Sequence, residues 1–293
     1  MKKALIIYNP TAGIKSKNDI SLDVQEKLDK LRYSSMVFFL DSNFEKNIAN
    51  HNISDIDLVI AIGGDGTVKV AAKTILENKL NARLAIIPFG SGNVVGKSLG
   101  LPINIKKAIK NLDSVEDVSI DIGVVNNKHY FIVGFGAGYI SEIIASTATK
   151  LKNKYGFLGY ILNSFISNLE VRRKKFKVII DGEKLYLKGN TLLVFNACNF
   201  YGIKPRMKIC PNDGELDLLV ATNKSFWSFL SAGIHLILFQ KPHKYFFTNR
   251  NKEFNIFFYK KPNCQIDGDY IKLPKEINIK VIPKAIRVVN YAK

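Results

Sequence analysis

The stretch DLVIAIGGDGT, residues 57–67, decides the fold of this chain. Residues 57–62 form an apolar run typical of a buried strand, and residues 68–76 have the apolar spacing of a helix. The glycines between them allow positive φ angles and let the backbone approach a ligand closely. N–H groups at the start of a helix can bind phosphate oxygens, so the loop predicts a phosphate site. Taken alone, the same loop also fits a plain strand-to-helix turn.

Two further loops follow apolar runs in the same way. NPTAG, residues 9–13, comes after the run 4–8, and PFGSGN, residues 88–93, comes after the run 84–87. Strands at 4–8, 36–40, 57–62 and 84–87 alternate with helices near 20–31, 43–50, 68–76 and 94–99, which predicts a parallel, doubly wound α/β sheet. Ligands bind at the carboxyl ends of such strands, so three loops at one edge describe a nucleotide-sized site. A P-loop motif is absent, and Gly-x-Gly-x-x-Gly does not follow the first strand, which argues against a dinucleotide dehydrogenase.

Beyond about residue 120 the pattern changes to short strands separated by Asp-Gly and Asn-Asn turns. This pattern predicts a mostly antiparallel β-sandwich or barrel. Two apolar stretches with helical spacing, residues 140–170 and 225–239, interrupt it. The expected strands are 118–125, 129–135, 176–181, 185–188, 191–197, 216–221, 254–259, 264–267, 277–282 and 285–290.

The charge is unevenly distributed along the chain. The formal net charge is +18, of which residues 1–120 contribute +3 and residues 121–293 contribute +15. The second half is therefore expected to meet a polyanion, either nucleic acid or an anionic membrane, unless the chain is simply basic throughout.

Three scattered cysteines fit a reducing compartment, and four scattered histidines argue against a zinc site. No signal peptide or membrane span is evident, which predicts a cytoplasmic protein.

The ordered set of motifs resembles the catalytic domain shared by diacylglycerol kinases, sphingosine kinases and related bacterial lipid kinases. The resemblance spans nearly the whole chain and implies a nucleotide-binding α/β domain at 1–120, a lipid-substrate β-sandwich domain at 121–285, and a C-terminal strand, 286–293, that returns to the first domain. The matching segments are NPTAG at 9–13, GGDGT at 63–67, PFGSGN at 88–93, DIG at 121–123, GFGAG at 134–138, DGELD at 213–217 and QIDGD at 265–269.

Site residues follow from the same resemblance. Asp65 is expected near the metal-bound phosphates, and Asp213 is expected to bind a structural Mg²⁺ with the backbone carbonyls of Cys210 and Glu215. Asp269 falls where the family usually has a glutamate that acts as general base, with Asp267 beside it, so either aspartate can take the proton. The residues implied to hold ATP are Asn9, Pro10, Thr11, Ala12, Gly13, Gly63, Gly64, Asp65, Gly66, Thr67, Val68, Lys69 and Ser91.

The resulting expectation is an ATP- and Mg²⁺-dependent lipid kinase that acts on diacylglycerol or a related membrane alcohol. It would bind peripherally to an anionic membrane at the inner face, and a homodimer is left open. No nucleic-acid motif occurs. Two alternatives are an NAD kinase-like small-molecule kinase, although its usual Asn-Glu segment is missing, and a non-catalytic basic lipid-binding module.

Overall fold

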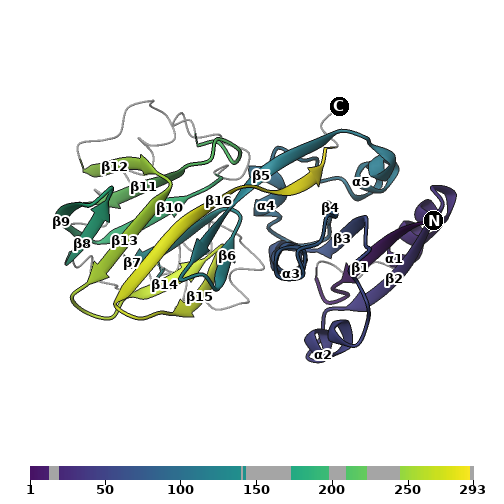
Figure 1. Ribbon diagram of the computed structural model, residues 1–293, viewed down its shortest axis with the longest axis horizontal. Coiled ribbons are helices and arrows are strands. Elements are labelled where there is room, and N and C mark those ends of the chain that lie inside the picture. The colour runs from purple at the N-terminus through teal and green to yellow at the C-terminus, as the bar shows by residue number, and fades with distance from the viewer. Residues whose placement is uncertain (13–19, 140, 143–172, 198–208, 223–244, 291–293) are drawn as a thin grey trace. The chain divides into compact units, whose positions relative to one another are not determined.

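The computed structural model of this 293-residue chain describes residues 1–12, 20–139, 141–142, 173–197, 209–222 and 245–290 (Figure 1). The expected helical stretches at 140–170 and 225–239 lie almost wholly outside these residues. The chain divides into two compact units. Unit 1 contains residues 1–120 and 284–293, and unit 2 contains residues 121–283. Two strands, β5 (Asp117–Val125) and β16 (Glu276–Val289), each contribute residues to both units.

Unit 1 is built on a parallel sheet with the strand order β2-β1-β3-β4, to which the end of β16 adds Arg287 and Val288 beside β4. All six residues of β3 are buried, as its apolar sequence requires. Each strand of this set lies within three residues of its predicted range. The strands are β1 (Lys2–Tyr8), β2 (Tyr33–Phe39), β3 (Leu58–Gly63) and β4 (Arg83–Pro88).

The helices of unit 1 pack against this sheet through their apolar stripes. In α1, Val24 and Leu28 are fully buried, and α3 buries Val68, Ala71 and Ile75. The sequence predicted four of the helices and missed α5. The helices are α1 (Ile20–Lys30), α2 (Phe44–Ala49), α3 (Asp65–Glu77), α4 (Val94–Ser98), α5 (Ile105–Lys110) and the 3-10 turn η1 (Asn111–Asp113).

Unit 2 is an antiparallel sandwich, as predicted. One sheet contains β16, β13, β8 and β9 in this order. Strand β5 pairs with β16 of this sheet, and β6 pairs with β5. The other sheet has the order β12-β11-β10-β7-β14-β15 (Figure 1). Buried residues from both sheets, among them Phe135, Phe176, Leu218 and Phe254, form one core. The strands are β6 (His129–Phe131), β7 (Gly134–Gly138), β8 (Lys174–Ile180), β9 (Glu183–Gly189), β10 (Thr191–Phe195), β11 (Leu216–Ala221), β12 (Phe246–Asn251), β13 (Glu253–Phe258), β14 (Asn263–Ile266) and β15 (Asp269–Lys272).

Three expectations about these strands were wrong in detail. The predicted strand 129–135 is two strands, because the N–H groups of residues 132–134 donate to the Asp267 carboxylate instead of to a neighbouring strand. The predicted strands 277–282 and 285–290 are one continuous strand, β16, with Lys284 at a φ of 48°. Strands β12 and β15 were missed because their sequences, FFTNRN and DYIK, lack a clean apolar alternation.

Candidate active site

The carboxyl ends of β1, β3 and β4 meet at one edge of the unit 1 sheet. Tyr8 lies opposite Ile62, and Gly63 lies opposite Pro88. Hydrogen bonds continue this pairing into the loops: Asn9 N donates to Ile62 O at 2.9 Å, and Phe89 N donates to Gly63 O at 2.8 Å. The three loops that the sequence singled out are therefore brought together by the sheet itself.

Gly64 and Gly90 bring two of these loops into backbone contact. A Cβ on Gly90 would lie 2.4 Å from Gly64 Cα, and a Cβ on Gly63 would lie 2.1 Å from Thr67 Oγ1. None of the three glycines, nor Gly66, has a positive φ, so that part of the sequence expectation was wrong. Glycine is required here for the close approach of loop to loop and of loop to helix.

Asn93 fixes the shape of the loop that follows β4. It adopts the left-handed conformation, with a φ of 47°, which asparagine tolerates better than most residues. Its Oδ1 accepts a hydrogen bond from Gly90 N at 3.0 Å, and its Nδ2 donates to Gly90 O at 2.8 Å. Asn93 belongs to the motif PFGSGN, but no role was predicted for it from the sequence. Its position one residue before a helix was the available signal.

Asp65 is the first residue of α3 and connects it to α4. Its Oδ1 accepts a hydrogen bond from Val95 N at 2.8 Å, and its Oδ2 lies against Gly92, where a Cβ would come within 3.1 Å. The residue before it, Gly64, has no side chain with which to cap the helix, so the first N–H groups of α3 can face a ligand. The carboxylate is thus held at the same sheet edge as the glycine loops.

The other residues implied to hold ATP lie around this edge. Asn9 Oδ1 accepts hydrogen bonds from Thr11 N at 3.0 Å and Thr11 Oγ1 at 2.8 Å, which fixes the loop after β1. Lys69 lies one turn of α3 beyond Asp65. Thr67 and Val68 are buried in α3, whereas Pro10, Thr11 and Ser91 are exposed. Gly13 lies outside the described residues. The close approach of the glycine loops and the uncapped start of α3 fit the phosphates of a nucleotide.

Asp267 and Asp269 lie in unit 2 and differ sharply in their surroundings. Asp267 accepts three backbone hydrogen bonds at 2.9 Å, with Oδ2 bound to Ile132 N and Oδ1 bound to the N–H groups of Val133 and Gly134. Asp269, the first residue of β15, has an exposed side chain. The two aspartates of this turn therefore differ in their surroundings, because Asp269 is exposed whereas Asp267 is half-buried and holds three backbone N–H groups.

Asp213 lies in a group of acidic residues around Arg250. Its Oδ1 accepts a hydrogen bond from Glu215 N at 3.1 Å, and its Oδ2 lies 3.5 Å from Arg250 Nη1. Arg250 Nε lies 3.0 Å from Asp217 Oδ1, and burial nevertheless raises the pKa of Asp217 above its ordinary value. Within the described residues no group of three or more His, Cys, Asp or Glu side chains could hold a metal ion. A Mg²⁺ bound to Asp213 and the carbonyls of Cys210 and Glu215 would have to share this carboxylate with a guanidinium.

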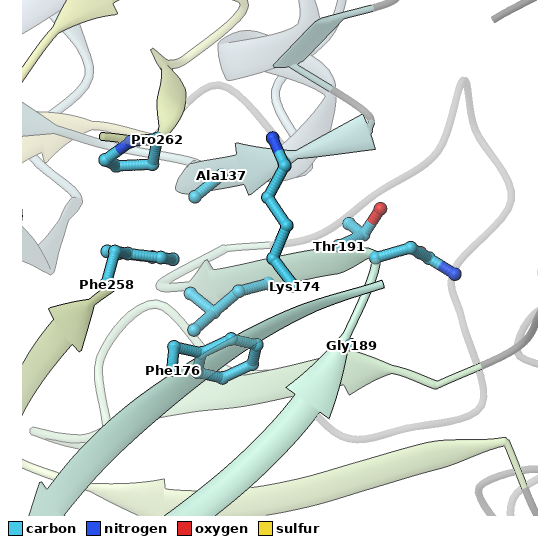
Figure 2. A pocket seen from close by; sticks show the side chains of 10 residues that line it. Ala137, Lys174, Phe176, Gly189, Thr191, Phe258 and Pro262 are labelled. Carbon is cyan, nitrogen blue, oxygen red and sulfur yellow. The ribbon is translucent and has the colours of Figure 1, made fainter. Parts of the chain in front are cut away.

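Unit 2 also has a small pocket beside strands β7, β8 and β10. Figure 2 shows the rings of Phe176 and Phe258 on its wall together with the side chain of Lys174. The Lys174 ammonium donates to Glu142 Oε1 at 3.0 Å, so its charge is already paired. None of the predicted site residues lines this pocket, whose walls are Ala137, Gly138, Lys174, Phe176, Gly189, Asn190, Thr191, Leu192, Phe258 and Pro262.

The chain is similar to known diacylglycerol kinases. Residues 3–125 match the family model of the diacylglycerol kinase catalytic domain. The chain is similar to diacylglycerol kinases of Staphylococcus epidermidis, with 29% identity over 92% of this chain and 86% of that one, and of Staphylococcus aureus, with 27% identity over the same shares.

Solved structures share the fold. Two structures from Bacillus anthracis str. Sterne superpose with TM-scores of 0.81 and 0.74 at 22% and 19% identity. Both comparisons cover 99% of this chain, with 95% and 96% of the other chains, and the second structure is described as a diacylglycerol kinase. These structures show the fold, while the family match at residues 3–125 and the similar staphylococcal proteins show that the chain is a kinase enzyme that resembles the diacylglycerol kinases.

Proposed function

We propose that the chain is an ATP-dependent lipid kinase that transfers the γ-phosphoryl group of ATP to the hydroxyl of a membrane lipid, diacylglycerol or a related alcohol. The observation that carries this proposal is the backbone contact between Gly64 and Gly90, which brings two loops together beside the uncapped start of α3. Such a surface suits a polyphosphate, because backbone N–H groups can approach the oxygens without side chains between them. The names of the similar staphylococcal proteins supply the class of acceptor.

The roles of the unit 1 residues follow from their positions. The N–H groups at the start of α3 would bind phosphate oxygens, and the loops after β1 and β4 would hold the rest of the nucleotide. Asp65 would orient the Mg²⁺ that accompanies ATP, and that ion would neutralise charge on the transferred phosphoryl group. Since Asp65 Oδ1 already accepts a bond from Val95 N, α4 keeps this carboxylate in one position.

In unit 2 we assign the general base to Asp269. Asp267 is the less suitable choice, because its two oxygens already accept three backbone hydrogen bonds. An exposed carboxylate can accept the proton that leaves the attacking hydroxyl. The magnesium site predicted at Asp213, with the carbonyls of Cys210 and Glu215, stays a prediction and would compete with Arg250 for the carboxylate.

The direct test is an assay with γ-labelled ATP, Mg²⁺ and diacylglycerol in neutral detergent micelles, followed by extraction into organic solvent. Label in the organic phase is expected. The variant Asp269→Asn should lower turnover by roughly 100-fold or more, in the range of a lost general base, with ATP affinity unchanged. Asp181→Asn is the matched control, because Asp181 occupies another Asp-Gly turn of unit 2. Equal rates in both variants would remove Asp269 from the mechanism.

The same assay separates the two alternatives. Label on NAD in the aqueous phase would identify a small-molecule kinase, whereas no label at all would favour a non-catalytic lipid-binding module.

For the location of the protein we propose the cytoplasm and the inner face of the membrane. No helix within the described ranges has the length and apolar character that spanning a bilayer requires. The contact with an anionic membrane would therefore be peripheral, and a homodimer stays a proposal.

A further inference from the structure

The outer face of one unit 2 sheet carries lysines and aromatic rings. Strand pairing places Lys175 opposite Lys188, and it places Lys177 between Tyr186 and Phe257 in one row across three strands. Their neighbours Phe176 and Val178 point the other way, into the core. We call this set the lysine face; its members are Lys175, Lys177, Lys184, Lys188, Tyr186, Phe257 and Tyr259.

The lysine face carries four positive charges. None of its four lysines forms an ion pair with any described residue, although lysines elsewhere, such as Lys27 and Lys73, have carboxylate partners. Lys175 and Lys188 lie directly opposite each other, an arrangement that destabilises a sheet. No described carboxylate forms an ion pair with Lys175 or Lys188, so an anion from outside the chain could balance their charge.

Protection of a sheet edge is the main alternative explanation. Lysines on an edge strand discourage pairing with another chain, and β9 is the edge of its sheet. This accounts for Lys184 and Lys188 on β9. It does not account for Lys175 and Lys177, because they lie on β8, which has β9 on one side and β13 on the other.

The aromatic residues indicate what kind of anion is bound. Tyr186 and Tyr259 are 69% and 52% exposed, and the Lys177 ammonium lies 5.5 Å from the centre of the Phe257 ring. Phe257 and Tyr259 stack edge to face at 5.8 Å. Amphipathic rings beside lysines are typical of surfaces at the lipid–water boundary, where the rings meet the headgroups and the ammonium groups meet the phosphates.

We propose that the lysine face docks unit 2 on an anionic phospholipid bilayer. The proposal rests on the proposed function, since a kinase for a bilayer alcohol must work at that surface. Four lysines on one sheet face, which have no ion-pair partner among the described residues, complement a negative membrane, and the row of rings supplies apolar contact.

The test is sedimentation of the full chain with vesicles of phosphatidylcholine alone and with added phosphatidylglycerol, over a series of salt concentrations. The wild type should bind the anionic vesicles, less so as salt rises. Lys175→Gln/Lys188→Gln should weaken this binding about 30-fold, the effect expected for two lysines at an anionic surface. The matched control is Lys106→Gln/Lys110→Gln, which removes the same charge from the exposed side of α5 and should bind like the wild type.

Two further measurements make the outcome decisive. The melting temperature of Lys175→Gln/Lys188→Gln should equal or exceed that of the wild type, because a repulsive pair is removed, so weaker binding cannot be explained by unfolding. Equal vesicle binding by the two double variants would overturn the proposal. A wild type that binds RNA but not anionic vesicles would overturn it as well.

Activity assays distinguish failure of this inference from failure of the proposed function. With diacylglycerol in neutral micelles, Lys175→Gln/Lys188→Gln should turn over as fast as the wild type, and on anionic vesicles it should be slower. A wild type that phosphorylates no lipid would refute the kinase assignment, whereas the vesicle-binding data would still decide the role of the lysine face.

Discussion

Units 1 and 2 both use aspartate next to glycine, but they use the pair for different purposes. In unit 1, Gly64 and Gly90 have no positive φ and serve to bring two loops together, while Asp65 accepts one backbone hydrogen bond from Val95. In unit 2, Asp267 and Gly268 both have positive φ and form a tight turn between β14 and β15.

The carboxylates show the same contrast. Asp267 accepts three backbone hydrogen bonds and thereby fixes the break between β6 and β7. Among the described residues Asp65 accepts one such bond, through Oδ1, so its Oδ2 could meet a metal ion. Because the same two residue types lie in similar positions after strands, their roles are distinguished by the donors that surround each carboxylate. The predictions below test that distinction.

The largest effect is expected at Asp65. Asp65→Asn keeps an oxygen that can accept the bond from Val95 N, so the melting temperature should change little. Turnover should fall by about 100-fold or more, because a charge beside the metal–phosphate group is lost. Asp29→Asn, an exposed change in α1, is the control for turnover. Normal turnover in Asp65→Asn would show that Asp65, like Asp267, has only a structural role.

Gly90→Ala tests whether the contact between the unit 1 loops is essential. The new Cβ would meet the backbone of Gly64, which cannot move aside as a side chain can, so the free energy of unfolding should fall by about 1–3 kcal/mol. The affinity for ATP should fall with it, as measured by titration calorimetry. Gly66→Ala has open space around the new Cβ and should be at least as stable as the wild type. Similar stability in both variants would show that the loops do not depend on their close contact.

Asp267→Asn tests the structural role of the unit 2 turn. The amide has one accepting oxygen, so at least one of the three N–H groups loses its partner, and urea unfolding should show a loss of about 1–3 kcal/mol. Asp269→Asn, at an exposed position, should stay within about 0.5 kcal/mol of the wild type. If Asp269→Asn were the less stable of the two variants, Asp269 would be the structural aspartate of this turn and Asp267 would not.

The smallest effect is expected at Arg250, and it depends on pH. Burial raises the pKa of Asp217, and Arg250 opposes that shift. The folded state therefore favours protonated Asp217, and this contribution to stability is lost as pH rises through the raised pKa. Arg250→Gln removes the opposing charge, so it should cost about 1–2 kcal/mol at pH 7 and less as the pH falls through the raised pKa of Asp217. A loss that does not vary with pH would mean that the ion pair contributes little.

The sequence alone determined the architecture of unit 1 and which loops lie at one edge of its sheet. The apolar run 57–62 predicts β3, which lies at Leu58–Gly63, and the alternation of strands and helices places the following loops at one edge. These features are local, because each depends on the pattern of a short window and on the rule that parallel strands align their carboxyl ends. The antiparallel character of unit 2 was predicted from its turns for the same reason.

Tertiary structure decided what each aspartate and glycine does. Asp267 binds Ile132, which is 135 residues away in the chain, and Asp65 binds Val95, which is 30 residues away. Gly64 and Gly90 likewise depend on each other's backbone, because a Cβ on Gly90 would lie 2.4 Å from Gly64 Cα and a Cβ on Gly64 would lie 3.3 Å from Gly90 Cα. A carboxylate becomes structural or chemically available according to the donors that the fold brings to it. Those donors come from distant segments, so no local pattern of residues could assign the roles.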